Sequence, residues 1–185
     1  MKERSPTTLE YALLGLVRQV PRSGYDLRKI FEETALGSYS GSPGAIYPAL
    51  RRLEKQGLIE GEIDATTTLR PRKVFRPTKA GTEVLHGWLS AKIEREDVER
   101  RVDELMLRFA FHGLLDSAVE TRHFLERFLE ETERYVETLK AEREGIPEEA
   151  PPHPRLALSA GIGQYQAWAR WARHALKSFM EVEDE

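Results

Sequence analysis

Apolar residues recur three or four positions apart through most of the chain, which is the spacing of one face of an α-helix. In the N-terminal part this pattern predicts helices over about residues 7–19, 24–35 and 43–56. Pro21 ends the first segment, and a stretch rich in serine and glycine separates the second from the third. The apolar face expected for the second segment consists of Tyr25, Leu27, Ile30 and Phe31.

The third segment carries the clearest start and stop signals. Ser42 can cap a helix N-terminus, and Pro43 suits the first helical position, where a missing N–H costs nothing. Pro48 in the second turn predicts a slight kink, and Gly57 is a typical C-terminal stop. The segment has an apolar stripe of Ile46, Leu50 and Leu53, and an outward stripe of Tyr47, Arg51 and Lys55.

After Gly57 the spacing changes to that of strands. Residues 58–63 and 74–77 are predicted as two short strands joined by a polar loop, residues 64–73. A further helix with apolar positions up to Leu89 follows. Three helices followed by a hairpin and a helix is the order of a winged helix-turn-helix, with the third helix in the recognition position.

Beyond residue 90 the pattern is helical, interrupted by a proline-rich linker at residues 145–154. The last helix, about residues 155–180, is apolar around much of its circumference, so it must be buried on more than one side. We therefore expect a mainly α protein with a small β-hairpin. Its parts are a winged helix-turn-helix over residues 1–90 and a helical dimerisation domain over residues 91–185.

Composition limits the class of protein. With 40% hydrophobic and 32% charged residues the chain is expected to be globular. It has no apolar run of eighteen residues and its charged start, Met1 to Pro6, lacks an apolar core, so neither a membrane span nor a signal peptide is expected. The absence of cysteine excludes disulfides and thiolate metal sites and fits a cytoplasmic location.

The distribution of charge matters more than the total of −3. Residues 1–90 carry a net charge of +4 and residues 91–185 a net charge of −7. Five basic residues and no acid lie between positions 70 and 79. This asymmetry is typical of a protein of which only one part meets phosphate, although chance variation in surface charge is an alternative.

Four segments resemble the PadR family of bacterial transcriptional regulators in order and spacing. The most specific is the run Ser-Pro-Gly-Ala-Ile-Tyr-Pro-Ala-Leu-Arg-Arg-Leu-Glu-Lys-Gln-Gly-Leu-Ile at residues 42–59. The others lie at residues 9–16, 23–27 and 74–81, so the resemblance covers about half of the chain. It departs at Phe75, where many relatives carry tyrosine.

The resemblance implies a winged-helix DNA-binding dimer, usually a repressor, and the tail is similar to the subgroup with a long helical dimerisation domain. It does not identify the effector. For a dimer we expect the two third helices to enter successive major grooves, about 34 Å apart, on a pseudo-palindromic operator in double-stranded DNA. An effector bound between the winged helices and the tail, or across the dimer axis, would change that spacing.

Candidate DNA-binding residues are hydroxyl, small or basic residues of the third helix, its start and the loop between the strands, because such groups reach phosphates and base edges. They are Ser40, Ser42, Gly44, Tyr47, Arg51, Arg52, Thr67, Arg70, Arg72 and Lys73. For the basic residues and Tyr47, the alternatives are salt bridges, solvated surface or core packing.

The aromatic residues of the last helix, Tyr165, Trp168 and Trp171, are the candidates for binding a small aromatic effector. Packing at a dimer interface is the alternative for them. The five histidines show no metal-ligand spacing, and no nucleophile elbow, dinucleotide loop or phosphate loop is present, so neither a cofactor nor an enzyme is expected. The rival function is a winged helix that contacts proteins, with the helical tail as the functional part.

Overall fold

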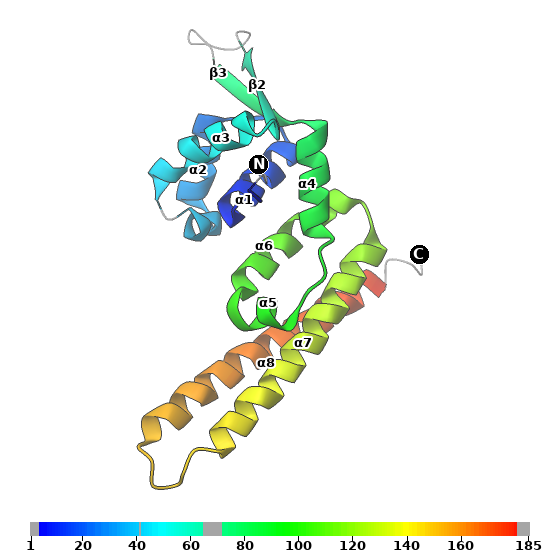
Figure 1. Ribbon diagram of the computed structural model, residues 1–185. Coiled ribbons are helices and arrows are strands. Elements are labelled where there is room, and N and C mark those ends of the chain that lie inside the picture. The colour runs from blue at the N-terminus through cyan, green and yellow to red at the C-terminus, as the bar shows by residue number, and fades with distance from the viewer. Residues whose placement is uncertain (1–3, 41, 65–71, 181–185) are drawn as a thin grey trace. The chain divides into compact units, whose positions relative to one another are not determined.

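The computed structural model describes residues 4–40, 42–64 and 72–180, and it divides into two compact units, Met1–Leu89 and Ser90–Glu185 (Figure 1). Within these residues no helix is long and apolar enough to cross a membrane.

The N-terminal unit is helical with a small sheet. Its helices are α1 (Thr8–Gln19), α2 (Gly24–Glu33), α3 (Ile46–Lys55) and α4 (Lys79–Leu89), with two 3₁₀ turns at Ala35–Tyr39 and Pro43–Ala45. The strands are β1 (Arg22–Ser23), β2 (Ile59–Asp64) and β3 (Arg72–Pro77). The predicted fold class, mainly α with a hairpin, is confirmed; the two-residue strand β1 is an addition that the apolar pattern did not indicate.

Two helices begin with the same reciprocal cap. Thr7 accepts a hydrogen bond from the backbone N–H of Glu10, whose carboxylate accepts one from the N–H of Thr7. Ser23 and Asp26 repeat the arrangement at the start of α2. These capping boxes satisfy N–H groups that have no partner inside a helix, and they fix where α1 and α2 start.

The start of α3 differs from the prediction. Ser42 precedes a 3₁₀ turn rather than the α-helix, and its side chain makes no capping hydrogen bond. The α-helix begins at Ile46, so Pro48 lies in its first turn, where its missing N–H breaks no helical hydrogen bond. The helix starts three residues later than expected, so the predicted position of Pro48 in the second turn, from which a slight kink was expected, is wrong.

The sheet has the strand order β1-β3-β2, with both pairs antiparallel. Its register places Phe75 opposite Gly61 and Arg72 opposite Asp64. Because side chains alternate along a strand, Lys73 and Phe75 share one face of the hairpin, and Arg72, Val74 and Arg76 share the other. This alternation separates two basic residues that are neighbours in sequence.

A tight junction joins α3, β2 and α4. Gly57 ends α3 with a left-handed φ of 68°, and the N–H groups of Gly57 and Leu58 bond to the carbonyls of Glu54 and Leu53. Thr78 donates its hydroxyl to the Gly57 carbonyl (2.6 Å) and accepts from the N–H of Gly81 (3.0 Å). A Cβ at Gly81 would lie 1.9 Å from the Leu58 carbonyl oxygen, so only glycine fits there.

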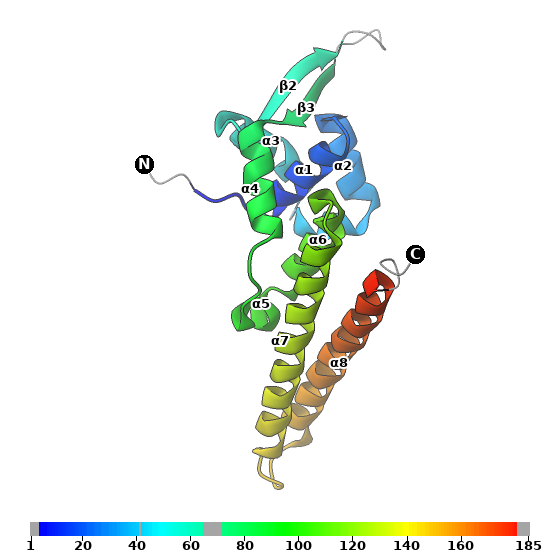
Figure 2. The same cartoon turned by 90° about the vertical axis from the view of Figure 1, so that its right-hand side faces the viewer.

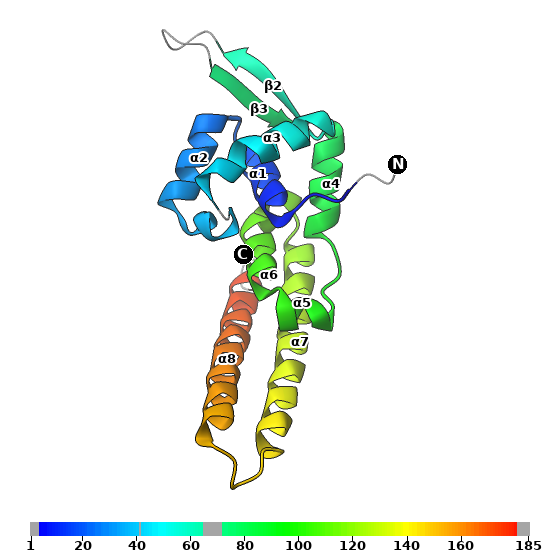
Figure 3. The same ribbon diagram turned by 60° about the vertical axis from the view of Figure 1, so that its left-hand side comes forward.

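Helix α1 is the centre of this unit, since it packs against α3, α4 and β3 (Figure 3). The ring of Tyr11 stacks on Trp88 of α4, with 4.5 Å between centroids. The fully buried apolar side chains include Leu13, Leu27, Ile46, Leu53 and Leu85. This core holds α3 by its apolar stripe and leaves the opposite stripe outside.

The C-terminal unit consists of α5 (Arg95–Arg100), α6 (Val102–Phe111), a 3₁₀ turn (His112–Leu115) and two long helices, α7 (Ala118–Glu144) and α8 (Pro152–Met180). The long helices form an antiparallel hairpin (Figure 2). Its main core gathers Leu105, Phe124, Leu125 and Phe128 with Ala172. A smaller cluster of Val136, Leu139 and Ile162 lies toward the connecting loop.

Candidate nucleic-acid interface

The outward stripe of α3 is exposed. Tyr47 is 43% exposed, and Arg51, one turn later, is exposed as well, whereas Ile46, Leu50 and Leu53 are buried. The Arg51 guanidinium has no ion pair or hydrogen bond within the described residues. A cation and a phenol therefore stand on the solvent side of the helix predicted to recognise DNA.

The start of α2 supports the ring of Tyr47. A Cβ added at Gly24 would lie 2.9 Å from the Cε1 atom of Tyr47. Glycine thus permits the ring to rest close to the α2 backbone. Ser42 and Gly44, also predicted to meet DNA, are exposed just before α3.

Arg52 is held by the chain itself. Its Nε donates a 2.6 Å hydrogen bond to the carboxylate of Glu10, whose side chain is only 2% exposed. Burial alone would raise the pKa of Glu10, but the hydrogen bonds from the Thr7 N–H and from Arg52, together with the charge of Arg52, lower it. Glu10 is therefore a carboxylate at neutral pH, and Arg52 is a less available DNA ligand than Arg51.

The hairpin positions its two described candidates differently. Lys73 points toward α3 and forms a 2.6 Å ion pair with Glu54. Arg72 lies on the other face, with its Cζ 5.8 Å from the ring centroid of Tyr25. Arg72 makes no ion pair with any residue that the structure describes. Arg51 and Arg72 are thus the candidate cations whose charge no carboxylate among the described residues pairs with.

Of the three remaining candidates, one is buried and two are not described. Ser40 is buried, and its hydroxyl donates to the carbonyl of Gly37 at 3.0 Å. Its role is therefore local, in the 3₁₀ turn. Thr67 and Arg70 lie outside the described residues.

Sequence reasoning missed two residues of this surface, Tyr25 and Arg28. Tyr25 was predicted on the apolar face of α2, but this is wrong, because the side chain is 51% exposed. It lies two positions before the buried Leu27, which places it on the opposite side of a helix. The spacing of Tyr25 from Leu27 in the sequence could therefore have indicated that Tyr25 is exposed.

The aromatic candidates of α8 pack inside the C-terminal unit. The ring of Trp171 lies edge-on to Phe109 (4.9 Å between centroids) and Phe128 (5.7 Å), and Trp168 packs edge-on to Trp171. Tyr165 donates its hydroxyl to the carbonyl of Val98 at 3.2 Å. These contacts tie α8 to α5, α6 and α7, so all three residues have a structural role in the hairpin.

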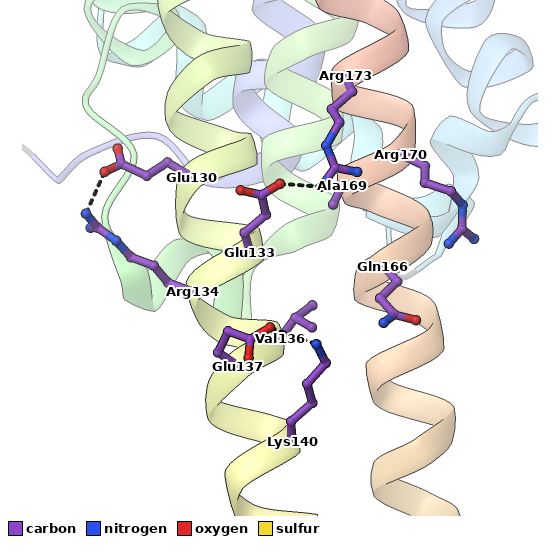
Figure 4. Close-up of a pocket in the computed structure, with 10 residues that line it drawn as sticks. All are labelled: Glu130, Glu133, Arg134, Val136, Glu137, Lys140, Gln166, Ala169, Arg170 and Arg173. Atoms are coloured by element: carbon purple, nitrogen blue, oxygen red, sulfur yellow. Dashed lines mark hydrogen bonds and ion pairs between the residues drawn. The ribbon is translucent and has the colours of Figure 1, made fainter.

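A polar cavity of about 740 Å³ lies between α7 and α8 (Figure 4). Glu133 of α7 pairs with Arg173 of α8 across it, and Arg134 pairs with Glu130 on α7. Val136 and Ala169, both buried, contribute its apolar lining. The predicted aromatic residues do not line this cavity. In the described parts of the chain no group of three potential metal ligands comes together.

Two family models match the chain. Residues 13–87 match the model described as "Transcriptional regulator PadR-like family", and residues 103–179 match "Virulence activator alpha C-term". Together they span most of both units.

Curated relatives agree with the first match. The negative transcriptional regulator PadR of Bacillus subtilis (strain 168) is 34% identical over 108 residues, which are 58% of this chain and 58% of that protein. The transcriptional regulator YqjI of Escherichia coli (strain K12) is 33% identical over 95 residues, 51% of this chain and 42% of that protein. The chain thus spans about half the length of the curated relatives it matches.

Similar solved structures include Bacillus subtilis PadR in complex with operator DNA, at 27% identity and a TM-score of 0.43 over 94% of this chain and 99% of that chain. The PadR-like regulator BC1756 of Bacillus cereus is 26% identical, with a TM-score of 0.43 over 97% and 99% of the two chains. On the family model and the curated relatives, residues 13–87 of the chain form a PadR-like domain of the kind found in transcriptional regulators.

Proposed function

We propose that this protein is a sequence-specific regulator that binds double-stranded DNA through α3 and represses transcription. The observation that carries the proposal is the exposed stripe of α3, on which Arg51 stands without a carboxylate partner in the described residues. An α-helix fits the major groove, and an arginine can donate two hydrogen bonds to one guanine there. Tyr47, one turn earlier, supplies a hydroxyl for a phosphate or a base edge.

Two copies of the chain would act together, joined through the C-terminal helices. The aromatic residues of α8 face the chain's own core, which favours the remaining face of α8 for the dimer contact. That face is uncharged from Leu156 to Ala169, in a chain with 32% charged residues, and Leu156 is 65% exposed. Its low charge suits a buried contact with a second copy.

Release by a small effector is the second part of the proposal. A ligand that favours a different spacing of the two α3 helices would lower operator affinity. Tyr165, Trp168 and Trp171 pack within the C-terminal unit, so a small aromatic effector would have to insert beside rings that already hold the hairpin together. Once DNA binding is measured, screening such molecules for loss of that binding tests this part of the proposal.

The rival function is a winged helix that contacts a protein. It predicts a recognition stripe without free cations, and Arg51 disfavours it. The two functions differ in their dependence on salt, because neutralising DNA phosphates releases counterions and binding weakens as salt rises.

Selection from fragmented genomic DNA tests the proposal. The full-length protein is incubated with the fragments at moderate salt, and the bound DNA is sequenced. We expect enrichment of inverted-repeat sites whose half-sites lie one helical turn apart, about 34 Å. The variant Arg51→Ala should lose this enrichment, whereas Arg100→Ala, an exposed arginine of α5, should retain it. Bound fragments with the composition of the input would refute sequence-specific binding.

A further inference from the structure

We propose that Tyr25 is a positioning residue for Arg72, and that these two residues with Arg28 form a second DNA-phosphate site at the corner between α2 and β3. The inference rests on the proposed DNA binding and extends it to a surface outside the recognition helix. Its ligand is a backbone phosphate, which carries no sequence information.

One ring gathers two guanidinium groups. The Cζ atoms of Arg28 and Arg72 lie 5.6 Å and 5.8 Å from the centroid of Tyr25, within the range of a cation–π contact. Arg28 belongs to the same helix as Tyr25, whereas Arg72 is the first residue of β3. The exposed tyrosine therefore links α2 to the start of β3, two elements that are in contact and that Figure 2 shows side by side.

The guanidinium groups of Arg28 and Arg72 would attract an anion. Each carries a positive charge, so a phosphate that approaches the ring of Tyr25 gains Coulomb attraction from both. Arg28 has an exposed partner, Glu32, at 3.1 Å, which costs little to replace. Arg72 has no ion-pair partner among the residues described.

Two acidic residues, Asp26 and Asp64, lie near this site. The carboxylate of Asp26 accepts hydrogen bonds from the N–H and the hydroxyl of Ser23, at 3.2 Å and 2.7 Å. Asp64 is the cross-strand neighbour of Arg72 and lines the adjacent hollow with it. The carboxylate of Asp64 reduces the positive charge at this corner. Binding of a phosphate therefore depends on the orientation of the Arg72 side chain as well as on its charge.

This corner adjoins the exposed face of α3. Tyr47 of α3 rests against Gly24, the residue that precedes Tyr25. A duplex whose major groove holds α3 would therefore present a flanking phosphate to the start of α2 and the start of β3. Immobilising a free arginine side chain on binding costs conformational entropy, and a ring that already orients the side chain reduces this cost.

The test is a double-mutant cycle on DNA affinity. Fluorescence anisotropy with a labelled duplex of random sequence is measured over a series of KCl concentrations for the full-length protein and for Tyr25→Leu, Tyr25→Phe, Arg72→Gln and the double variant Tyr25→Leu/Arg72→Gln. Thermal unfolding of each variant checks the fold. Because the ring is exposed, its replacement should leave the unfolding midpoint largely unchanged.

We expect Arg72→Gln to lower the slope of log affinity against log salt by about 0.9, the value for one phosphate contact. Tyr25→Leu should weaken binding about 2–5-fold at low salt, in line with an exposed cation–π contact. The double variant should bind no more weakly than Arg72→Gln, and Tyr25→Phe, which keeps the ring, should bind like the unchanged protein.

Additive losses in the double variant, unchanged affinity in Tyr25→Leu, or a Tyr25→Phe variant as weak as Tyr25→Leu would each overturn the inference. If Arg51→Ala weakens binding in the same assay, the proposed function stands regardless. If the unchanged protein binds no duplex at any salt concentration, the proposed function itself fails, and this inference with it.

Discussion

Glu10 is a single buried carboxylate that organises two parts of the N-terminal unit. It caps α1 through the N–H of Thr7 and holds Arg52 of α3 at 2.6 Å. The exposed Arg4 lies 3.7 Å from the same carboxylate. This buried acceptor connects the start of α1 to α3, and removing it would leave the N–H of Thr7 and the guanidinium of Arg52 without this partner.

Glu10 should make stability depend on pH. Its pKa in the folded state is lowered, so the stabilisation is complete above the unfolded value of about 4.3 and is lost as pH falls through the folded value. We expect Glu10→Gln to lower the free energy of unfolding by about 1–2 kcal/mol at pH 7, with a smaller difference near pH 3. Denaturant unfolding at both pH values measures this. A difference that is the same at both pH values would contradict the ionised role of Glu10.

Single residues show where sequence reasoning succeeds and where it stops. The exposure of Arg51 and Tyr47 follows from their spacing relative to Ile46 and Leu50. The partner of Arg52 could not be predicted, because Glu10 lies 42 positions earlier and only the packed fold brings them together. An ion pair was an open alternative for Arg52 from the sequence, but the acid that forms it could not be identified there.

At the scale of elements, the junction between β2 and α4 depends on glycine at position 81. A Cβ there would collide with the backbone oxygen of Leu58, which a side-chain rotation cannot relieve. Gly81→Ala should therefore destabilise the protein by more than about 2 kcal/mol, the range of severe backbone and packing effects. Thermal or denaturant unfolding provides the measurement.

Gly87 in the same helix is a matched control. A Cβ at Gly87 meets nothing within 4 Å, so Gly87→Ala should be neutral or stabilise the helix by up to about 1 kcal/mol. Equal effects of the two substitutions would show that helix propensity, rather than the contact with Leu58, determines the cost.

Phe128 anchors the hairpin of α7 and α8. It is fully buried, and its ring contacts Trp171 of α8 and Phe124 of α7. Phe128→Ala should cost about 3–5 kcal/mol, whereas Val119→Ala on an exposed position of α7 should change stability by less than about 0.5 kcal/mol. Similar unfolding midpoints for the two variants would mean that the aromatic cluster does not hold the hairpin.

Element boundaries were less predictable than element types. The four helices and the hairpin of the N-terminal unit follow from the apolar pattern, but the start of α3 depends on a 3₁₀ turn that Ser42 and Pro43 do not distinguish from a helix. Strand β1 has two residues, too few for any periodicity, and it forms because Arg22 and Ser23 pair with Phe75 and Val74. Such short strands form because a distant strand pairs with them, and this pairing cannot be predicted from the local sequence.

At the scale of the whole molecule, the expected dimer uses the outer face of α8. Ala167 lies on that face and is exposed, so Ala167→Glu adds a charge without disturbing the hairpin core. We expect sedimentation to give a dimer for the unchanged protein and for Ala80→Glu on α4, and a shift toward monomer for Ala167→Glu. A dimer that tolerates Ala167→Glu would place the contact elsewhere.

The net charge of −3 conceals a basic half and an acidic half, and that division was readable from the sequence. The sequence did not indicate which basic residues lack a carboxylate partner. Arg52, Arg72 and Lys73 were all predicted to bind DNA, but Arg52 and Lys73 form ion pairs, whereas Arg72 forms none among the described residues. The structure thus identifies which basic residues of the N-terminal unit have no acidic partner among the described residues.

The most direct test of α3 as the recognition helix is a fluorescence-anisotropy titration of the full-length protein against the duplex that flanks its own gene. It is run at low and moderate salt, with Arg51→Ala and Arg100→Ala beside the unchanged protein. We expect tight binding that salt weakens and little change for Arg100→Ala. Arg51→Ala should lose about tenfold or more in affinity, since one arginine–guanine contact is worth about 1–3 kcal/mol. Equal binding by both variants, in protein that is folded, would contradict the assignment of α3 as the recognition helix.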